Sequence, residues 1–494
     1  MSASNYFFIY TKRPNGGSIE VVVLGFTLPL SGWLADVYIG RYRVIRWSMW
    51  IIWVGSVLAT ASSVVAKLTE NYYSSKIMEN LSVLFLFVLA IGFGGYIGNI
   101  IQFGMDQLYD ASTSEITAFI CWFTWTNYSS YAIFQLFYMC LNEKYFTLGE
   151  LHVCISITTV IVSTFILDTM LVKEPVTQNP FKLIYKVIRY AIRNKYPRRR
   201  SAFTYCEDEL PSRIDFGKSK YGGPFTTEQV ENVKTFLRLI IITTIASIII
   251  SDIFVTYRPR DRFIKELIHI SWNQIKTMKE CYMYKERFLA HTIGYCAIVL
   301  LIPLHKLIIY PATQKCFPSI KIYQIFLLGT AIQIINITIE LVFDITARRV
   351  YSEHVNVSHC IFQHSISSNY NSGWMTITLI LDSLSQALLF ISAIEFLVSQ
   401  TPYSMRGLIF GAGYGSVFLF MIIGYGIYWP FIHLPKSWGT GIISCEFWYL
   451  LLVLLVMVAS SGLLLVAVRW YKNRKREDVL PNEHIFAERF YGEP

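Results

Sequence analysis

Charged residues are scarce in this chain. Only 15% of its 494 residues are Asp, Glu, Lys or Arg, whereas 54% are hydrophobic and the mean hydropathy is +0.43. A soluble domain of this size could not bury so much apolar surface. Apolar windows of about 20 residues, each long enough to cross the hydrocarbon core of a bilayer as a helix, recur along the chain. We therefore predict an all-α polytopic membrane protein.

Other signals are also missing. The nine cysteines form no CxxC pair and no cluster at metal-ligand spacing, so we predict no disulfide framework and no metal site. Residues 1–18 lack the apolar core of a signal peptide, because Lys12, Arg13 and Pro14 interrupt them. The chain has no nucleophile elbow, phosphate-binding loop or metal-ligand set, which argues against an enzyme. The net charge of +10 fits basic loops beside a lipid bilayer better than binding of nucleic acid.

Eleven membrane spans are predicted, five before and six after the long polar segment Lys173–Lys234. This pattern divides the chain into an N-terminal helical bundle (1–172), a basic inter-bundle loop (173–234), a C-terminal helical bundle (235–475) and a tail (476–494). The predicted spans are Glu20–Tyr38, Val44–Lys67, Asn80–Ile101, Ala118–Cys140, Leu151–Leu171, Phe236–Tyr257, Ala290–Tyr310, Ile322–Phe343, Thr376–Val398, Leu408–Trp429 and Phe447–Trp470.

The distribution of basic residues predicts the orientation of the spans. Lys173–Lys234 and the basic run after Arg469 are expected on the cytoplasmic side, and His354–His359 on the other side, where Asn356 begins a glycosylation sequon. Arg258–Arg287 carries eight Lys and Arg residues, although the alternation of spans places it outside. It is either an amphipathic helix on the membrane surface or a sign of a miscounted span.

The stretch "GWLADVYIGRYR" (Gly32–Arg43) places charges between the first two predicted spans. Gly32 and Gly40 allow tight turns and close approach of helices. Asp36, near a helix end, can pair with Arg41 or Arg43. Such a cluster can hold two helix bundles together in one conformation and release them in another. Simple anchoring of the loop by its arginines is the alternative.

Several motifs carry a family resemblance. "LSGWLADVYIGRYRVI" resembles the cytoplasmic loop signature of the major facilitator superfamily and, more narrowly, of the proton-coupled oligopeptide transporter family. "GFGGYIGNIIQFGMDQ", "CWFTWTNYSS", "KYGGPFTTEQVENVKTF", "LIPLHKLIIYP" and "IEFLVSQTPYSMRG" resemble further segments of that family, in the same order. The residues that this resemblance assigns to a cytoplasmic gating motif are Gly32, Asp36, Gly40, Arg41, Arg43, Asp106 and Arg406.

The resemblance implies a major facilitator fold of two six-helix bundles. It implies alternating access that moves di- or tripeptides, or another small nitrogenous solute, with the proton as coupling ion and no cofactor. The plasma membrane or an endolysosomal membrane is the expected location. The opening motif closes the family's second span, so we expect this chain to lack the first one. A truncated sequence is the expected reason, and a true eleven-span protein is the alternative.

The resemblance also implies that charges are lost from the substrate cavity. The family's E-x-x-E-R motif belongs to the missing span, Ile97 stands at its Lys, and Gln386 stands at the Glu that binds the substrate amine. A Gln side chain can accept a hydrogen bond from an ammonium but gives no charge pairing. We therefore expect little or no proton-driven dipeptide uptake. A transporter-like sensor or interaction partner that no longer transports is the alternative function.

Four further positions complete the predicted site. Asp252 corresponds loosely to an acidic residue of the seventh span, although a polar residue near the outer end of a helix is equally expected. Asn127 matches an Asn of the fifth span and either lines the cavity or packs between helices. Lys306 stands where the family often has an acid. Glu395 is expected to be a structural acid that caps or pairs near the cytoplasmic end of its helix.

Overall fold

The computed structural model describes residues 16–68, 72–108, 111–140, 146–173, 175–176, 179–194, 196, 211–272, 293–304, 306–307, 322–352, 374–432 and 445–471. Within these ranges the chain is helical, and its only strand-like pairing is an isolated bridge between Lys218 and Phe225. The long helices are α2 (Gly16–Leu34), α3 (Arg41–Leu68), α4 (Tyr72–Asp106), α5 (Thr113–Cys140), α6 (Phe146–Ile166), α7 (Pro180–Arg193), α8 (Thr227–Trp272), α11 (Ile322–Ser352), α12 (Trp374–Gln400), α13 (Arg406–Ile432) and α14 (Cys445–Trp470).

The described helices confirm the all-α membrane prediction. Eight of them are long and apolar enough to cross a membrane. Two further predicted spans coincide with the shorter apolar helices Leu151–Ile166 and Ile293–Leu304, and the predicted span Ala118–Cys140 lies within α5. Residues 354–359, the sequon at Asn356 and the tail beyond residue 471 lie outside the described residues, so their placement stays a prediction.

The basic segment Arg258–Arg287 corrects one expectation. Helix α8 continues without a break from Thr227 to Trp272, so the described part of this segment extends a spanning helix. A separate helix on the membrane surface is therefore wrong for residues 258–272. The remainder of the segment lies outside the described residues.

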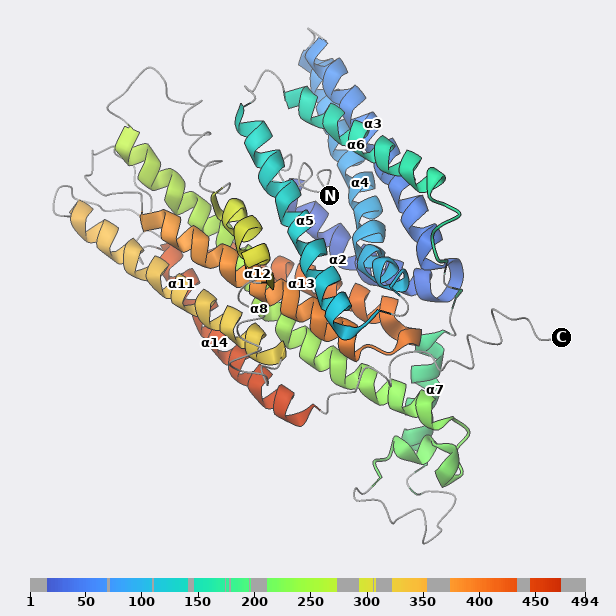
Figure 1. Cartoon of the computed structure of the whole chain (residues 1–494). Coiled ribbons are helices and arrows are strands. Elements are labelled where there is room, and N and C mark those ends of the chain that lie inside the picture. Colours follow the sequence, from blue (N-terminus) through green and yellow to red (C-terminus); the bar gives the residue numbers. More distant parts are fainter. Residues whose placement is uncertain are drawn as a thin grey trace.

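The helices pack in two groups. Helices α2, α3, α4 and α6 contact one another and form an N-terminal bundle, to which α5 belongs by its order in the chain. Helices α8, α11, α12, α13 and α14 form a C-terminal bundle, and the closest packing between the bundles is that of α2 against α13 (Figure 1). One apolar core cluster contains residues of both bundles, including Ile101 and Met105 of α4 with Leu408 and Val417 of α13.

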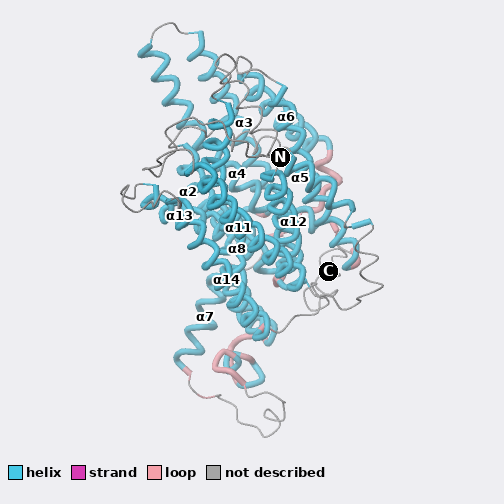
Figure 2. The backbone as a smooth tube through the Cα atoms, turned by 90° about the vertical axis from the view of Figure 1, so that its left-hand side faces the viewer, coloured by secondary structure: helices cyan, strands magenta, loops and turns pink. Residues whose placement is uncertain are grey.

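A folded segment connects the bundles where a loop was expected. Helix α7 begins at Pro180 after Asn179, whose side chain accepts hydrogen bonds from the backbone N–H groups of Phe181 (3.1 Å) and Lys182 (3.3 Å). Its Ile184, Val187 and Ala191 are buried, and the helix packs against α8. Figures 1 and 2 both place α7 at one edge of the molecule, and Figure 1 shows it beside the start of α8. We call α7, residues 211–226 and the first three turns of α8 the stalk.

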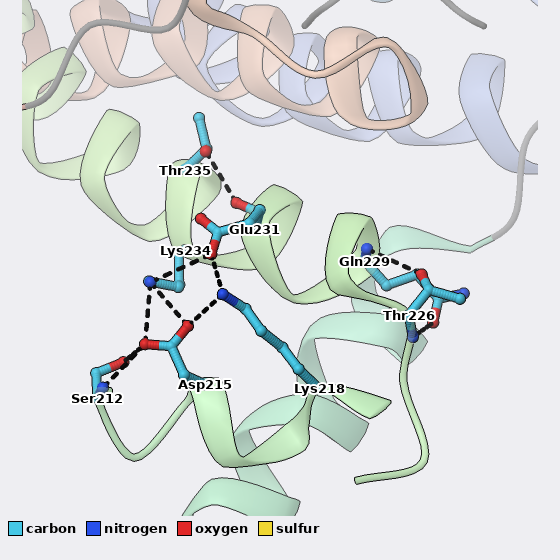
Figure 3. A network of polar contacts seen from close by, with 8 residues as sticks. All are labelled: Ser212, Asp215, Lys218, Thr226, Gln229, Glu231, Lys234 and Thr235. Atoms are coloured by element: carbon cyan, nitrogen blue, oxygen red, sulfur yellow. Dashed lines mark hydrogen bonds and ion pairs between the residues drawn. The ribbon is translucent and has the colours of Figure 1, made fainter. Parts of the chain in front are cut away.

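Four alternating charges hold residues 211–226 against the start of α8 (Figure 3). Lys218 pairs with Asp215 (2.7 Å) and with Glu231. Lys234 pairs with Asp215 (2.9 Å) and Glu231 (3.4 Å), and Ser212 donates to Asp215 from its backbone N–H (2.9 Å) and its hydroxyl (2.6 Å). Asp215 and Lys218 are both buried, so neither charge could remain there without its partners.

The network shifts the pKa values of its buried members. Burial raises the pKa of Asp215, but hydrogen bonds from Lys218, Ser212 and Lys234 outweigh burial and hold that pKa well below its usual value. Burial lowers the pKa of Lys218, but Asp215 and Glu231 outweigh it and raise the pKa above its usual value. Both shifts favour the charged forms, so the folded stalk is stabilised by ionisation.

The stalk should therefore be stable across a wide pH range. A carboxyl whose pKa is depressed by folding contributes stability above its unfolded pKa of about 3.9, and that stability is lost as the pH falls towards the folded value. A Lys whose pKa is raised by folding contributes stability below its unfolded pKa of about 10.4. That stability is lost as the pH rises towards the folded pKa. The hydrogen-exchange protection factors of residues 211–226, taken relative to the intrinsic exchange rate at each pH, should accordingly stay high between these limits and fall beyond either one.

Removing one charge should have a similar effect at neutral pH. Asp215→Asn should cost about 3 kcal/mol of local stability, because it takes a partner from both Lys218 and Lys234. Glu228→Gln is the matched control, since Glu228 is exposed in the first turn of α8 and lies outside the network. Equal hydrogen-exchange protection in the two variants would contradict this description of the stalk.

Candidate functional site

The turn between α2 and α3 brings two charges of the opening motif together. Helix α2 ends in a wider turn, Ala35–Ile39, and the N–H of Gly40 donates to the carbonyl of Ala35 (3.1 Å). Gly40 has a φ of 88°, which favours glycine, and α3 starts at the next residue. As a result Asp36 and Arg41 are both buried, with 2% and 5% of their surfaces exposed.

Arg41 joins two carboxylates. Its Nη1 donates to both carboxylate oxygens of Asp106 (2.7 and 2.8 Å), at the last residue of α4. Its Nε and Nη2 donate to Oδ1 of Asp36 (3.3 and 3.2 Å). The predicted pairing of Asp36 is thus with Arg41. Arg43 is exposed and makes no ion pair in the described part of the chain.

The same carboxylates reach across to the C-terminal bundle. Oδ2 of Asp36 accepts a hydrogen bond from the backbone N–H of Leu408 (3.0 Å), in the first turn of α13. Nη1 of Arg406 lies 3.8 Å from Oδ1 of Asp106. The N–H groups of a first turn have no partner within their own helix, and the helix dipole favours an anion there. Asp36 therefore caps a helix of the opposite bundle. We call Asp36, Arg41, Asp106 and Arg406 the inter-bundle charge cluster.

Glycines allow this approach. A Cβ on Gly32 would lie 2.2 Å from the carbonyl oxygen of Gly407, and one on Gly407 would lie 2.4 Å from Oδ1 of Asp36. A Cβ on Gly411 would lie 2.7 Å from the carbonyl oxygen of Leu28, and one on Gly415 would lie 2.7 Å from Cδ of Pro29. The sequence analysis named Gly32 but missed the three glycines of α13. Their spacing, one glycine at every fourth position from 407 to 415, is typical of close helix contacts in membranes.

A second polar contact crosses between the bundles. The hydroxyl of Thr117 on α5 donates to Oε1 of Glu395 on α12 (2.8 Å). Lys306 also interacts electrostatically with Glu395. The sequence predicted a structural acid at Glu395, and the structure places its carboxylate at the boundary of the bundles.

A buried carboxylate that the sequence analysis missed lies beside Gln386. Asp382, one turn earlier on α12, accepts hydrogen bonds from Nε2 of Gln386 (3.0 Å) and from Nε2 of Gln333 on α11 (3.0 Å). Its exposed fraction is 8%. Tyr128 of α5 lies within electrostatic range of Asp382, so a residue of the N-terminal bundle lies near this group. An acid inside a predicted span was the available signal.

The other predicted site residues lie apart from this group. Ile97 is half-buried and packs against the core of the N-terminal bundle. Asp252 is buried near Tyr449, and its Oδ2 has no hydrogen-bond partner in the described part of the chain. Asn127 is half-buried beside Tyr128, which is itself near Asp382. Among the described residues, no hydrogen bond or ion pair joins Ile97, Asp252 or Asn127 to Gln386. No group of metal-ligating side chains occurs within the same residues.

Asp36→Asn should loosen the contact between the bundles without unfolding them. The neutral amide weakens both the cap on α13 and the pairing with Arg41, and a change of about 1–3 kcal/mol in the conformational equilibrium is expected. Cys121 reports this change, since it is buried between α5, α12 and residues 298–302. In a chain that retains only this cysteine, Asp36→Asn should raise the rate of maleimide labelling, whereas Arg43→Gln should leave it unchanged. Equal labelling rates in both variants would refute the cap.

Two glycines of α13 provide a matched steric test. Gly411→Ala should separate α2 from α13 at a cost of about 1–3 kcal/mol, because the new Cβ would meet a backbone oxygen. Gly413→Ala should be tolerated, because its Cβ would lie an ordinary 3.6 Å from Cδ1 of Leu397. Thermal unfolding in detergent distinguishes the variants. A Gly411→Ala protein as stable as Gly413→Ala would show that the helices do not cross this closely.

Known proteins similar to this chain are transporters. No family model matches it. Solute carrier family 15 member 3 of Mus musculus is 22% identical over 492 residues, which cover 90% of this chain and 83% of the relative. Solute carrier family 15 member 5 of Homo sapiens is 22% identical over 221 residues, which cover 42% of this chain and 37% of the relative.

Solved structures share the fold. The crystal structure of an auto inhibited POT family peptide transporter has a TM-score of 0.63 and 14% sequence identity, and the match covers 96% of each chain. The in meso crystal structure of the POT family transporter PepTSo has a TM-score of 0.63 and 16% identity, covering 95% of this chain and 90% of that one. These comparisons confirm the resemblance that the sequence motifs indicated. The chain is an integral membrane protein with the major facilitator fold of the POT family transporters, and its sequence is similar to solute carrier family 15.

Proposed function

We propose that this chain is a membrane transporter that moves small peptides or related nitrogenous solutes by alternating access. The cap that Asp36 places on α13 is the observation that carries the proposal, because it is a polar contact between bundles that can break and form again. The similarity to solute carrier family 15 and to POT family peptide transporters supports the substrate class.

The described contacts suggest which bonds change during the cycle. Arg41 binds Asp36 and Asp106 within the N-terminal bundle, so these ion pairs can persist while the bundles move. The bonds from Leu408 to Asp36 and from Thr117 to Glu395, and the ion pair of Arg406 with Asp106, cross between bundles. These three contacts would break when this end of the transporter opens. Because Arg41 stays paired with Asp36 and Asp106, the N-terminal bundle would not expose these charges unpaired when the bundles separate.

Asp382 is the proposed binding group for a substrate ammonium. Two amides orient its carboxylate, and the surrounding helices come from both bundles. It lies one helical turn from Gln386, where the resemblance implied a lost Glu. A carboxylate at this depth would restore the charge pairing that Gln386 does not provide. Asp382 therefore favours dipeptide transport despite the charges that are missing at Ile97 and Gln386.

Coupling, orientation and location belong to the same proposal. We assign the end that carries the stalk and the inter-bundle charge cluster to the cytoplasm, because its connecting segments are basic. Bundles of residues 1–172 and 235–475, an inter-bundle segment of 173–234 that contains most of the stalk, and a tail of 476–494 are the proposed divisions. Asp252, a buried acid whose Oδ2 has no hydrogen-bond partner in the described part of the chain, is the proposed proton carrier. The plasma membrane or an endolysosomal membrane is the proposed location.

Two alternatives are less well supported. A sensor or interaction partner was suggested by the missing charges, and neither relative named above is described as a sensor. An enzyme is also disfavoured, because those relatives are carriers. Small nitrogenous solutes and the bilayer are the proposed partners, and we propose no binding of nucleic acid and no cofactor.

Uptake of a labelled dipeptide into proteoliposomes, with and without an inward proton gradient, tests the function. The unmodified chain should take up dipeptide. Asp382→Asn should raise the dipeptide concentration for half-maximal uptake about 10- to 100-fold, since a hydrogen bond to a charged group contributes roughly 1.5–3 kcal/mol.

Glu395→Gln is the matched control, because it removes a carboxylate from the same helix at the contact between bundles. Glu395→Gln should change the maximal rate of uptake more than the dipeptide concentration for half-maximal uptake. An unmodified chain that transports no dipeptide under either condition would refute the function. If Asp382→Asn takes up dipeptide with the same concentration for half-maximal uptake as the unmodified chain, only the role of Asp382 in binding the ammonium would be refuted.

A further inference from the structure

We propose that the C-terminal segment Glu477–Pro494 of this chain docks on the exposed face of α7. Phe181, Tyr185 and Ile192 are 48%, 61% and 69% exposed, although they are large and apolar. Tyr185 and Ile192 lie seven residues apart, or about two turns, on the solvent side of the helix. Ile184, Val187 and Ala191 are buried on the opposite side, which packs towards α8. An exposed apolar stripe on a folded helix is suited to contact with another segment.

A stripe of cations runs beside these apolar residues. Lys182, Lys186, Arg189 and Arg193 follow one another at spacings of three or four residues and are all exposed. Helix α7 contains no acidic residue to balance them. The face therefore combines apolar surface with positive charge, and its complement is a segment that combines apolar and acidic residues.

The bilayer covers this face poorly. Phe181 lies against Trp33 near the end of α2, with ring centroids 6.0 Å apart, whereas Tyr190 lies against Phe225, just before α8 begins (6.0 Å). Further along α8, Ser247 bonds to the carbonyl of Gly413 (3.3 Å), seven residues into α13. The first turns of α8 thus project past the start of α13, and α7 runs beside them, away from the spanning helices. Only the Phe181 end of α7 is level with those helices.

The sequence of the C-terminal segment has the required composition. Residues 477–494 include five acids, Glu477, Asp478, Glu483, Glu488 and Glu493, and only one Lys or Arg, at position 489. Apolar residues Val479, Leu480, Ile485, Phe486 and Phe490 alternate with these acids. Its charge and apolar content therefore complement those of α7.

The structure also fixes where this segment starts. Trp470, the last residue of α14, lies under the guanidinium of Arg238 on α8 at 5.5 Å. Tyr471 is buried, and its hydroxyl donates to Gln400 (3.0 Å). The chain therefore leaves the C-terminal bundle at the base of the stalk. The six residues to Glu477 span up to about 20 Å, close to the length of about 21 Å expected for α7. Such a tether gives a high effective concentration of the segment at α7.

Photo-crosslinking in the full chain tests the proposal. Tyr185→benzoylphenylalanine, in nanodiscs of phosphatidylcholine with phosphatidylserine, should form intramolecular crosslinks to peptides from residues 477–494. Met170→benzoylphenylalanine is the control, since Met170 is 79% exposed near the same end of the molecule but outside α7. It should give at least tenfold fewer of these crosslinks.

A charge exchange separates specific docking from chance contact. Reversing the tail by Glu477→Lys, Asp478→Lys, Glu483→Lys and Glu488→Lys should reduce the Tyr185 crosslinks at least tenfold, and this change leaves every described residue intact. Adding Lys182→Glu, Lys186→Glu, Arg189→Glu and Arg193→Glu to the reversed tail should restore them. Phospholipid adducts in place of tail crosslinks, crosslinks between two copies of the chain, or a yield equal to that from Met170 would overturn the proposal.

Discussion

The hydrogen bond from the backbone of Leu408 to the carboxylate of Asp36 is the contact on which the arrangement of the two bundles depends. It places a charge of one bundle at the positive end of a helix in the other, where the first-turn N–H groups need an acceptor. A buried carboxylate would be costly by itself, but Arg41 neutralises it within its own bundle. The approach is sterically possible because Gly32 and Gly407 have no Cβ atoms.

The remaining features of this end of the molecule follow from that constraint. Arg41 also holds Asp106, so the ends of α2, α3 and α4 form one charged unit facing α13. Thr117 and Glu395 add a second polar contact between α5 and α12. Residues 211–226 then fold against the start of α8, because Asp215 and Glu231 are paired with Lys218 and Lys234. Movement of the bundles can therefore be concentrated in a few exchangeable contacts.

Much of this fold could be predicted from the sequence, because long apolar windows and the Gly32–Arg43 motif are local signals. The pairing of Asp36 with an arginine of that motif was also predictable. Its cap on α13 was not, since a sequence does not reveal which helix ends meet. Asp382 was not predicted, because its burial and its hydrogen bond from Gln333 of α11 depend on how two helices pack. Helix α7 carries a local helical period that its sequence already shows, so a loop was the wrong prediction there. The ion pairs of Lys218 with Glu231 and of Asp215 with Lys234 were not predictable, because they join residues 13 and 19 positions apart that only the folded chain brings close.

A double-mutant cycle on the inter-bundle charge cluster tests the account most directly. In a chain whose nine native cysteines are replaced, spin labels at Arg43→Cys and Glu228→Cys, both exposed positions, would report the distance between α3 and the start of α8. The populations of short and long distances would be measured by pulsed electron resonance with Asp36→Asn, with Asp106→Asn and with both. Because Arg41 links the two carboxylates, the account predicts a coupling free energy above about 0.5 kcal/mol. Additive effects within that limit, or a single unchanged distance in all variants, would contradict it.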